Sequence, residues 1–351
     1  MCAGESPLLL NYTVLTILRG QDFFFVVNFM VSYDIIIIGA GPAGLATAIE
    51  AKKAGLRHLV IDKGGIVNGI QQYQRNMFFF STPELLEIGD IPFIVPTMRP
   101  TSLDCLNYYR GVAEHFDLNC RFYERVLSVG QCESDFLVQT SIGSEYRTRS
   151  IVAATGYYDT PNRLGVPGEN LPHVTHYYHD PLPYYRQDVL IVGGKNSAVE
   201  AALDLWRHGA RVTVLHRGDT LSAGVKYWIL PDFENRVAEG SIALHLKTDA
   251  KEFRPGCAIV ETEDKQWEVE TDFAFVLIGY RPDVTFLQRL GIHVDPESLV
   301  PAHNPETMET NVPNLFVAGG MVGGKYNNKV FIENGREHGK RILGAILNRI
   351  G

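Results

Sequence analysis

The stretch from Tyr33 to Asp62, YDIIIIGAGPAGLATAIEAKKAGLRHLVID, decides the fold that we expect for this chain. It contains an apolar run at 35–38, a glycine turn, an alanine-rich segment and a second apolar run that ends at Asp62. Strand, glycine turn, helix and strand in this order form the unit that binds a dinucleotide. The stretch therefore predicts an α/β fold built on a nucleotide-binding sheet.

The glycine turn itself is Gly39-Ala40-Gly41-Pro42-Ala43-Gly44. In this pattern Gly39 makes the tight turn, Gly41 lets the backbone approach a pyrophosphate, and Gly44 lets the helix pack closely on the strand. The N-terminus of the helix offers N–H groups and a positive dipole end to the pyrophosphate. Asp62 follows Gly44 by 18 residues, where an acid accepts hydrogen bonds from a ribose. The competing interpretation is a glycine-rich loop in an ordinary α/β protein.

Length and composition narrow the class of protein. The 351 residues suit about two domains, and a hydrophobic content of 45% supports a large core. The net charge of -8, without a long basic run, argues against a nucleic-acid partner. The cysteines form no CxxC pair, which indicates a reducing, cytoplasmic setting; they are Cys2, Cys105, Cys120, Cys132 and Cys257.

Residues 1–30 are apolar but interrupted by Glu5, Arg19 and Asp22. They lack the basic start of a signal peptide and the roughly 20 uninterrupted apolar residues of a membrane helix. We expect the natural chain to start at Met30 and the preceding residues to be an extension without a structural role. A peripheral membrane anchor is the alternative, and we expect no membrane association.

The segment after Asp62 leads to a second glycine turn. The loop 63–93 is rich in Gln, Asn and aromatic residues. In a flavin protein this loop would contact the flavin or the substrate, and the alternative is an ordinary packed loop. Thr101 and Asp104 resemble a capping box for an amphipathic helix that extends to about 116. Three strands, at about 121–129, 136–140 and 146–154, then end in Thr155-Gly156, a turn whose backbone we expect beside the flavin nucleotide.

A second unit of the same kind starts at Asp188 with DVLIVGGKNS, so that Gly193 lies 154 residues after Gly39. The repeat predicts a second dinucleotide. Its second strand, 211–215, ends in His216-Arg217 instead of an acid. An arginine there suits a 2′-phosphate and favours NADPH over NADH, the competing interpretation being a surface arginine at a strand end. Lys195 replaces the middle glycine, which either adds charge toward the pyrophosphate or alters the loop.

The remainder of the chain completes both units. A meander at about 242–246, 257–261 and 267–270 leads into an apolar run at 273–278. A strand within 310–320 then ends in glycines, and a last helix starts at 330–336 and runs to about 348. We therefore expect two Rossmann-like, three-layer domains, with the domain assigned to NADPH (161–281) inserted in a discontinuous first domain (31–160 and 282–351), to which the resemblance given below assigns FAD.

Together the turns at 39–44, 153–156, 193–198 and 318–320 and the pair His216-Arg217 resemble the thioredoxin-reductase-like two-dinucleotide flavoproteins, over about 31–351. The segments GGKNSAVEAAL, YYHDPLPYY, NMFFFSTPELLEIGDIPF and FIENGREHG are most similar to the bacillithiol-disulfide reductase branch. The resemblance implies one FAD, use of NADPH and a homodimer. It implies FAD contacts at Gly39, Gly41, Pro42, Ala43, Gly44, Asp62, Lys63, Gln71, Asn76, Thr155, Gly156, Gly319 and Gly320, and NADPH contacts at Gly193, Gly194, Lys195, Asn196, Ser197, His216 and Arg217.

The chain departs from that resemblance at three places. The CxxC dithiol of thioredoxin reductases falls on His176 to His179, and the cysteine of the bacillithiol branch falls on Ala43. The usual aspartate that holds the ribityl chain is Gly320. We assign His176 and His179 as candidate proton donors, because an imidazole titrates near neutral pH. Polar packing and a metal pair are the alternatives for these histidines, and we expect no metal.

We predict a cytoplasmic FAD-dependent NADPH oxidoreductase that passes electrons to a small disulfide such as bacillithiol disulfide, or to a small redox protein. One alternative is a ferredoxin- or flavodoxin-NADP reductase, which also lacks CxxC. The other is a non-catalytic flavin redox sensor.

Overall fold

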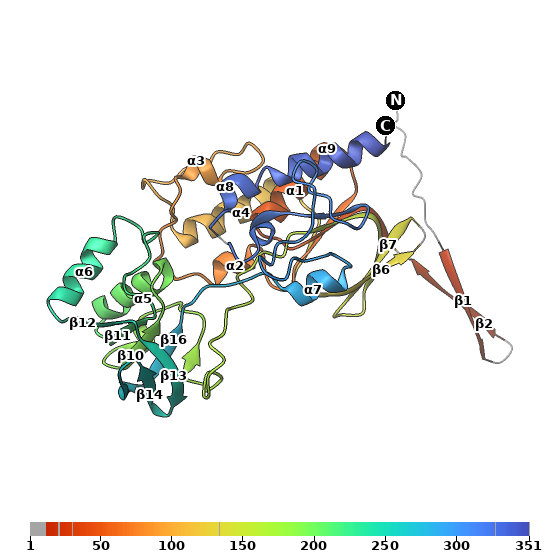
Figure 1. The fold of residues 1–351 in the computed structure, drawn as a ribbon. Coiled ribbons are helices and arrows are strands. Elements are labelled where there is room, and N and C mark those ends of the chain that lie inside the picture. Colours follow the sequence, from red (N-terminus) through yellow and green to blue (C-terminus); the bar gives the residue numbers. More distant parts are fainter. Residues whose placement is uncertain (1–11, 20–21, 30, 133, 327, 351) are drawn as a thin grey trace.

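The predicted first strand is the centre of the larger of two sheets. A computed structural model describes residues 12–19, 22–29, 31–132, 134–326 and 328–350 (Figure 1). In this part of the chain the larger sheet has the order β5-β4-β3-β8-β7-β6, and a further strand, β17, pairs with β8. Its strands are β3 (Val31–Ile38), β4 (His58–Ile61), β5 (Cys120–Arg121), β6 (Val126–Cys132), β7 (Asp135–Thr140), β8 (Glu145–Ala153) and β17 (Leu315–Val317). The sheet therefore unites segments from the two ends of the chain.

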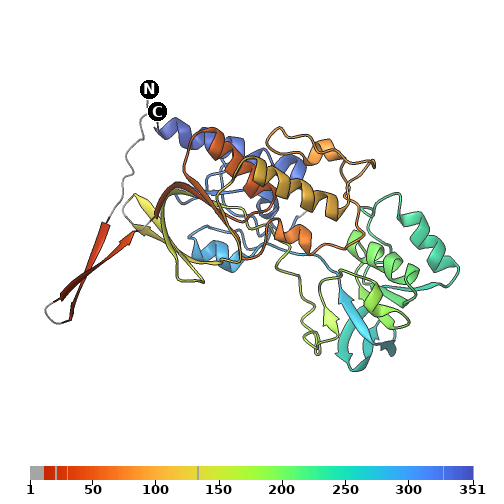
Figure 2. The same cartoon turned by 180° about the vertical axis from the view of Figure 1, so that it is seen from behind.

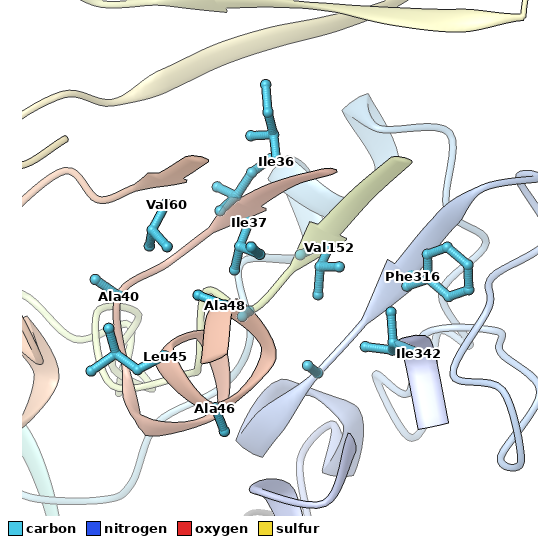
Figure 3. Close-up of a cluster of buried hydrophobic side chains, with 14 of the residues drawn as sticks. Ile36, Ile37, Ala40, Leu45, Ala46, Ala48, Val60, Val152, Phe316 and Ile342 are labelled. Carbon is cyan, nitrogen blue, oxygen red and sulfur yellow. The ribbon is translucent and has the colours of Figure 1, made fainter. Parts of the chain in front are cut away.

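The parallel strands of this sheet are buried on both faces. β3 pairs in parallel with β4 and β8, and β8 pairs in parallel with β17. Ile36, Ile37, Val152 and Phe316 all belong to this core, and Figure 3 shows Ile37 on the face covered by helix α1 (Pro42–Lys53) and Ile36 on the opposite face of β3. A strand covered on both faces needs apolar residues at consecutive positions, which is why four isoleucines follow one another at 35–38.

The predicted capping box is confirmed. Thr101 accepts a hydrogen bond from the Asp104 N–H, and the Asp104 carboxylate accepts one from the Thr101 N–H at 2.8 Å. It opens α4 (Ser102–His115), and Cys105 on this helix is fully buried, as expected for a core residue. The loop before α4 contains two single-turn helices, α2 (Asn68–Gln71) and α3 (Pro83–Leu86).

The second nucleotide unit forms its own sheet, whose order is β12-β11-β10-β16-β9 among the described residues. All its pairings are parallel. Its strands are β9 (Val174–Thr175), β10 (Asp188–Val192), β11 (Arg211–His216), β12 (Ile242–Leu246) and β16 (Phe273–Val276), with helices α5 (Asn196–Arg207) and α6 (Leu230–Ala238) beside them. Figure 2 shows this sheet in a lobe of its own, and its residues lie between β8 and β17 in sequence. The expected insertion of one Rossmann-like domain in the other is confirmed, whereas its exact boundaries stay a prediction.

One strand of the second lobe was assigned wrongly. The segment 242–246 was expected to open the meander, but it is an edge strand of the parallel sheet. The meander consists of β13 (Asp249–Arg254), β14 (Gly256–Glu261) and β15 (Gln266–Thr271). The sequence of β13, DAKEFR, buries only Ala250 and Phe253, so its period is too weak to be recognised. A short apolar run such as IALHL fits either sheet, and only packing on α6 and β11 decides between them.

The predicted continuous last helix is also wrong. It is divided into α8 (Ile332–Gly335) and α9 (His338–Ile350). A Cβ atom added at Gly335 would lie 3.3 Å from the Gly319 Cα atom, so the end of α8 is pressed against a turn. The chain must redirect there before α9 packs on α1. The remaining short elements are α7 (Val284–Arg289) and the 3₁₀ turns η1 (Leu182–Tyr184) and η2 (Gly319–Gly323).

The N-terminal extension contains a hairpin, β1 (Tyr12–Arg19) with β2 (Asp22–Phe29). Among the described residues these strands pair only with each other, and in Figures 1 and 2 they project away from both lobes. The expected start at Met30 falls outside the described residues and stays a prediction. No helix in the described part of the chain is both long and apolar enough to cross a membrane.

A matched pair of substitutions in α9 tests its packing on α1. A Cβ atom at Gly339 would lie 2.8 Å from Thr47 Cα, whereas one at Gly344 would meet nothing within 4 Å. Gly339→Ala should lower the free energy of unfolding by about 1–3 kcal/mol, because the helices must separate. Gly344→Ala should leave it unchanged or raise it by up to about 1 kcal/mol through helix propensity. Urea unfolding measures both, and equal effects would contradict the packing described here.

Candidate functional site

The first glycine turn connects β3 with α1 and has the steric pattern that the sequence predicts. Gly39 has a φ of +115°, and a Cβ atom there would collide with the Ala154 carbonyl oxygen. A Cβ atom at Gly44 would collide with the Gly39 carbonyl oxygen, whereas one at Gly41 would meet nothing within 4 Å. Gly39 and Gly44 are therefore required by the protein itself. Gly41 borders open space at the start of α1, where the unpaired N–H groups of a helix are available to an anion.

Asp62, at the end of β4, holds this turn in place. One carboxylate oxygen accepts a hydrogen bond from the Ala40 N–H at 2.7 Å, and the other accepts one from the Gly64 N–H at 2.8 Å. Burial raises the pKa of the Asp62 carboxyl, and the two N–H donors oppose that shift. Each carboxylate oxygen has a second lone pair, so a ribose hydroxyl can still donate to Asp62. The acid thus shapes the loop, and its contact with a nucleotide stays a prediction.

In the loop after Asp62 some polar side chains are bonded within the protein, and at least one is exposed without a partner among the described residues. The Lys63 ammonium pairs with Asp159 at 2.8 Å, which ties the loop to the segment that leaves the first lobe. Gln71 donates to the Ile66 carbonyl at 2.7 Å, the packed-loop arrangement. Asn76 is exposed and makes no hydrogen bond within the described chain. The polar atoms of Asn76 are therefore free for a ligand.

Two further turns meet the first one at the same edge of the sheet. Thr155 and Gly156 follow β8, and Gly319 and Gly320 follow β17. These strands are parallel neighbours, so their carboxyl ends lie side by side. A Cβ atom at Gly319 would lie 2.8 Å from the Ala43 Cβ atom in the first turn. The carboxyl edge of an open parallel sheet is where such folds bind ligands.

A histidine that the sequence did not single out supports the third turn. The Gly319 N–H donates to His338 Nδ1 at 3.1 Å, at the start of α9. Burial, with smaller effects from Arg341 and His303, lowers the pKa of His338 to about 4. The imidazole is therefore neutral at physiological pH, with Nδ1 free to accept. The Gly-Arg-Glu-His segment around the break in the last helix is the only sequence signal of this contact.

The turn of the second unit repeats the geometry of the first. Gly193 has a φ of +154°, and its N–H donates to the Leu215 carbonyl at 2.9 Å. A Cβ atom at Gly194 would collide with the His216 ring, which also lies close to Gly218. His216 therefore covers the turn instead of extending from the strand end. Like the first turn, this one leads directly into a helix N-terminus, that of α5.

Of the remaining residues predicted for the second site, some have side chains bonded within the protein and others have side chains without a partner among the described residues. Asn196 donates to the Gly224 carbonyl at 2.9 Å and accepts from the Lys226 N–H at 2.7 Å, so its side chain holds the neighbouring loop. Lys195 and Arg217 are exposed, and neither side chain makes an ion pair or hydrogen bond among the described residues. Ser197 is exposed, and its carbonyl accepts from Gln74 of the first lobe at 3.1 Å. Two unpaired cations thus border this turn.

The two candidate catalytic histidines do not act as a pair. His176 is buried, with Nε2 3.4 Å from a Glu169 carboxylate oxygen. Burial, assisted by Arg163, lowers the pKa of His176. His179 is exposed, and its Nδ1 lies 2.8 Å from the Tyr73 carbonyl oxygen of the first lobe. These contacts favour polar packing, and a proton-donor role stays a prediction.

No group of three His, Cys, Asp or Glu residues that could hold a metal ion occurs among the described residues. His176 and His179 therefore have no third ligand partner in that part of the chain.

Sequence reasoning missed a cluster of tyrosines between the lobes. Tyr158 lies 4.8 Å from Tyr73, 5.5 Å from Tyr177 and 4.2 Å from Tyr280, measured between ring centroids. Tyr158 and Tyr280 belong to the two connecting segments that join the lobes. Burial raises the pKa of Tyr177 to about 12 and raises those of the other three, so the phenols stay protonated. The pair YY directly after Thr155-Gly156 is the available sequence signal.

A buried ion pair also joins the lobes. Lys226 is 7% exposed, and its ammonium pairs with Glu200 on α5. It also donates to the Phe78 carbonyl of the first lobe at 3.0 Å. Removing one partner of a buried pair leaves an uncompensated charge, so these three groups stabilise this arrangement of the lobes.

Comparison with known proteins agrees with this geometry. Residues 36–319 match the family model of the pyridine nucleotide-disulphide oxidoreductases. The chain belongs to that family. It is 42% identical over 322 residues to the bacilliredoxin reductase Bdr of Bacillus subtilis, covering 91% of this chain and 99% of the relative.

Solved structures of bacillithiol disulfide reductase Bdr are also similar to the chain. The structure from Bacillus cereus has a TM-score of 0.88 and 43% identity, covering 91% of this chain and 99% of that one. The structure from Staphylococcus aureus has a TM-score of 0.89 and 40% identity, covering 92% and 100%. The predicted resemblance and fold class are confirmed.

Membership of the pyridine nucleotide-disulphide oxidoreductases makes the chain a flavin oxidoreductase that uses a flavin and a nicotinamide cofactor. The described geometry fits such cofactors, because two glycine turns each open a helix at the carboxyl edge of a parallel sheet. Which residues contact which cofactor is not tested by these comparisons and stays a prediction.

The buried imidazole of His338 should make stability depend on pH. Its pKa of about 4 lies below the value near 6.5 of an unfolded chain, so only the unfolded state gains a proton between these values. The free energy of unfolding should therefore fall by about 3 kcal/mol as the pH decreases from about 6.5 to 4. Urea unfolding at several pH values measures the slope. His338→Gln should remove this contribution, exposed His293→Gln should keep it, and identical slopes in all three proteins would contradict it.

Proposed function

We propose that this protein is an FAD-dependent NADPH oxidoreductase that reduces a small disulfide, such as bacillithiol disulfide, without a dithiol of its own. The proposal rests on the two glycine turns, whose units differ in the residue that follows the second strand. The first is followed by an acid, Asp62, and the second by an unpaired cation, Arg217. The substrate class comes from the activity named for the B. cereus and S. aureus relatives, bacillithiol disulfide reductase, whereas the B. subtilis relative is named a bacilliredoxin reductase.

FAD is assigned to the first lobe. The turn at 39–44 and the start of α1 would hold the pyrophosphate, and Asp62 would accept from the ribose. The turns at 155–156 and 319–320 would border the rest of the nucleotide, with Asn76 free to contact it. Asp62 supports this role because its two backbone contacts keep the carboxylate at the mouth of the first turn.

NADPH is assigned to the second lobe. The turn at 193–194 and the start of α5 would hold its pyrophosphate, with Lys195 adding positive charge. Arg217 would bind the 2′-phosphate through its guanidinium, whose fork of N–H donors matches phosphate oxygens. His216 is assigned a supporting role, because its ring packs on Gly194.

Bound FAD supplies two-electron transfer between NADPH and a disulfide. The chain itself offers no thiol relay at the positions expected from related enzymes, which are His176, His179 and Ala43. Burial raises the pKa of Cys105, and it raises that of Cys120 to about 11, so neither thiol is a thiolate at neutral pH. In this proposal Cys105 and Cys120 relay no electrons, and the acceptor disulfide is reduced without a protein disulfide on the path. A homodimer, based on the resemblance, and a cytoplasmic location, based on the scattered cysteines, are further proposals.

The choice of NADPH can be tested at Arg217. Arg217→Ala should raise the KM for NADPH by about tenfold or more, because a charge-assisted contact to the 2′-phosphate is lost, and should leave the KM for NADH nearly unchanged. Steady-state kinetics with both cofactors measures the difference. Arg254→Ala, an exposed arginine on β13, is the matched control and should change neither value. Equal effects of Arg217→Ala on both cofactors would reject the assignment.

The acceptor can be identified by anaerobic reduction with one equivalent of NADPH, followed by mixing with candidate acceptors. We expect rapid reoxidation by bacillithiol disulfide and slow reoxidation by ferredoxin, flavodoxin and quinone. A variant with all five cysteines replaced by serine should retain both half-reactions. Fast reoxidation by ferredoxin or flavodoxin would instead support the NADP-reductase alternative. Reduction without fast reoxidation by any acceptor would support the sensor, and failure of the cysteine-free variant would reveal a hidden thiol step.

A further inference from the structure

Gly320 lies directly against the ring of Tyr157. A Cβ atom added at Gly320 would lie 2.5 Å from Tyr157 Cε1 and 2.8 Å from Tyr157 Cδ1. Distances below 3.0 Å are not tolerated, so any side chain at position 320 would displace this ring. The two residues, 163 positions apart in sequence, therefore occupy one shared volume.

The need for glycine at position 320 is steric and not conformational. Gly319 has a φ of +75°, a left-handed value that favours glycine whatever surrounds it. Gly320 is absent from the described residues with positive φ, so its backbone would accept any L-residue. The ring of Tyr157 is thus what excludes a side chain from position 320.

Tyr157 lies where the segments assigned to the flavin meet. It follows the turn at Thr155-Gly156 and packs on the turn at Gly319-Gly320. Its phenol also lies close enough to the Tyr73 phenol to add to the rise in the pKa of Tyr73 that burial causes. Its hydroxyl makes no hydrogen bond to any described residue. Burial raises the pKa of Tyr157, so this hydroxyl keeps its proton and remains a donor.

None of the residues of the third turn itself has a polar side chain. Its residues are Gly319, Gly320 and Met321. A hydroxyl- or phosphate-bearing part of a cofactor that passes this turn would lose hydrogen bonds to water, and each group left unpaired would weaken binding. The unpartnered hydroxyl of Tyr157 lies beside this turn and can replace one of those bonds; the Thr155 hydroxyl, 3.6 Å from Met321 Sδ, is a second polar group near it.

We propose that Tyr157 is a cofactor-binding residue: its ring, seated on Gly320, forms one wall of the flavin site, and its hydroxyl donates a hydrogen bond to a hydroxyl or phosphate oxygen of the bound FAD. Gly320 is the complementary small residue that admits the ring. This inference rests on the proposed assignment of FAD to the turns of the first lobe.

The hydroxyl is tested by Tyr157→Phe, with the FAD dissociation constant measured by fluorescence quenching on the apoprotein. Loss of one hydrogen bond should weaken FAD binding by about 2- to 10-fold, with the melting temperature of the apoprotein unchanged. Tyr158→Phe is the matched control, because the Tyr158 hydroxyl already donates to the Gln72 carbonyl at 3.3 Å. Tyr158→Phe should leave FAD binding within about twofold of the parent. Unchanged binding in Tyr157→Phe, or equal losses in both variants, would overturn the hydroxyl contact.

The shared volume is tested by a double-mutant cycle. Gly320→Ala should weaken FAD binding by about tenfold or more because it displaces the ring, and adding Tyr157→Ala should recover part of that loss. Gly111→Ala is the control, since a Cβ atom there meets nothing within 4 Å. Additive effects of Gly320→Ala and Tyr157→Ala would overturn the pairing.

A third variant separates this inference from the FAD assignment itself. Asp62→Ala, shown by circular dichroism to be folded, should lose FAD if the cofactor occupies the first lobe. Retained FAD in Asp62→Ala would reject the assignment and the Tyr157 inference with it. Loss of FAD in Asp62→Ala together with normal FAD binding in Tyr157→Phe would reject the Tyr157 hydroxyl contact alone.

Discussion

The close approach of backbone to backbone at the first glycine turn is the constraint on which the rest of the structure depends. A Cβ atom at Gly39 or Gly44 would collide with a carbonyl oxygen, so α1 can start at the carboxyl edge of the sheet only because both residues lack one. This start places the helix N-terminus and the open position at Gly41 beside the ends of β4, β8 and β17. The open position at the start of α1 therefore follows from a packing requirement of the protein itself.

The crowded glycine turn occurs twice, once in each parallel sheet, and this repeat explains the two-lobed architecture. Gly193 and Gly194 repeat the turn in a second parallel sheet, where Leu277 and His216 take the roles of crowding neighbours. The chain crosses between the lobes twice, and Tyr158 and Tyr280 from these crossings pack against each other. Together with the buried Lys226 they join the two lobes through side-chain contacts in addition to the covalent connections.

Predictions from the sequence were correct where the interactions that determine the structure join residues close in sequence. The glycine spacing at 39–44, the four isoleucines of β3 and the Thr101–Asp104 capping box all describe contacts within one unit, and each was predicted correctly. The errors occurred where a distant partner decides. The segment 242–246 was assigned to the wrong sheet, and the last helix was predicted without the break that Gly335 makes against Gly319. Tyr157, His338 and Lys226 were missed for the same reason, because their partners lie far away in sequence.

The sequence by itself determined the fold class, the repeat of two nucleotide-binding units, the family and the absence of cysteines at the expected dithiol positions. These properties depend on residue type and spacing, which are visible in the linear chain. Only the tertiary structure decided that Asp62 braces its own turn, that His216 covers Gly194, and that His176 and His179 face different neighbours. It also placed Tyr157 on Gly320. The physical reason is that the identity of a contact depends on which strands become neighbours, and that choice is made by the packing of the whole chain.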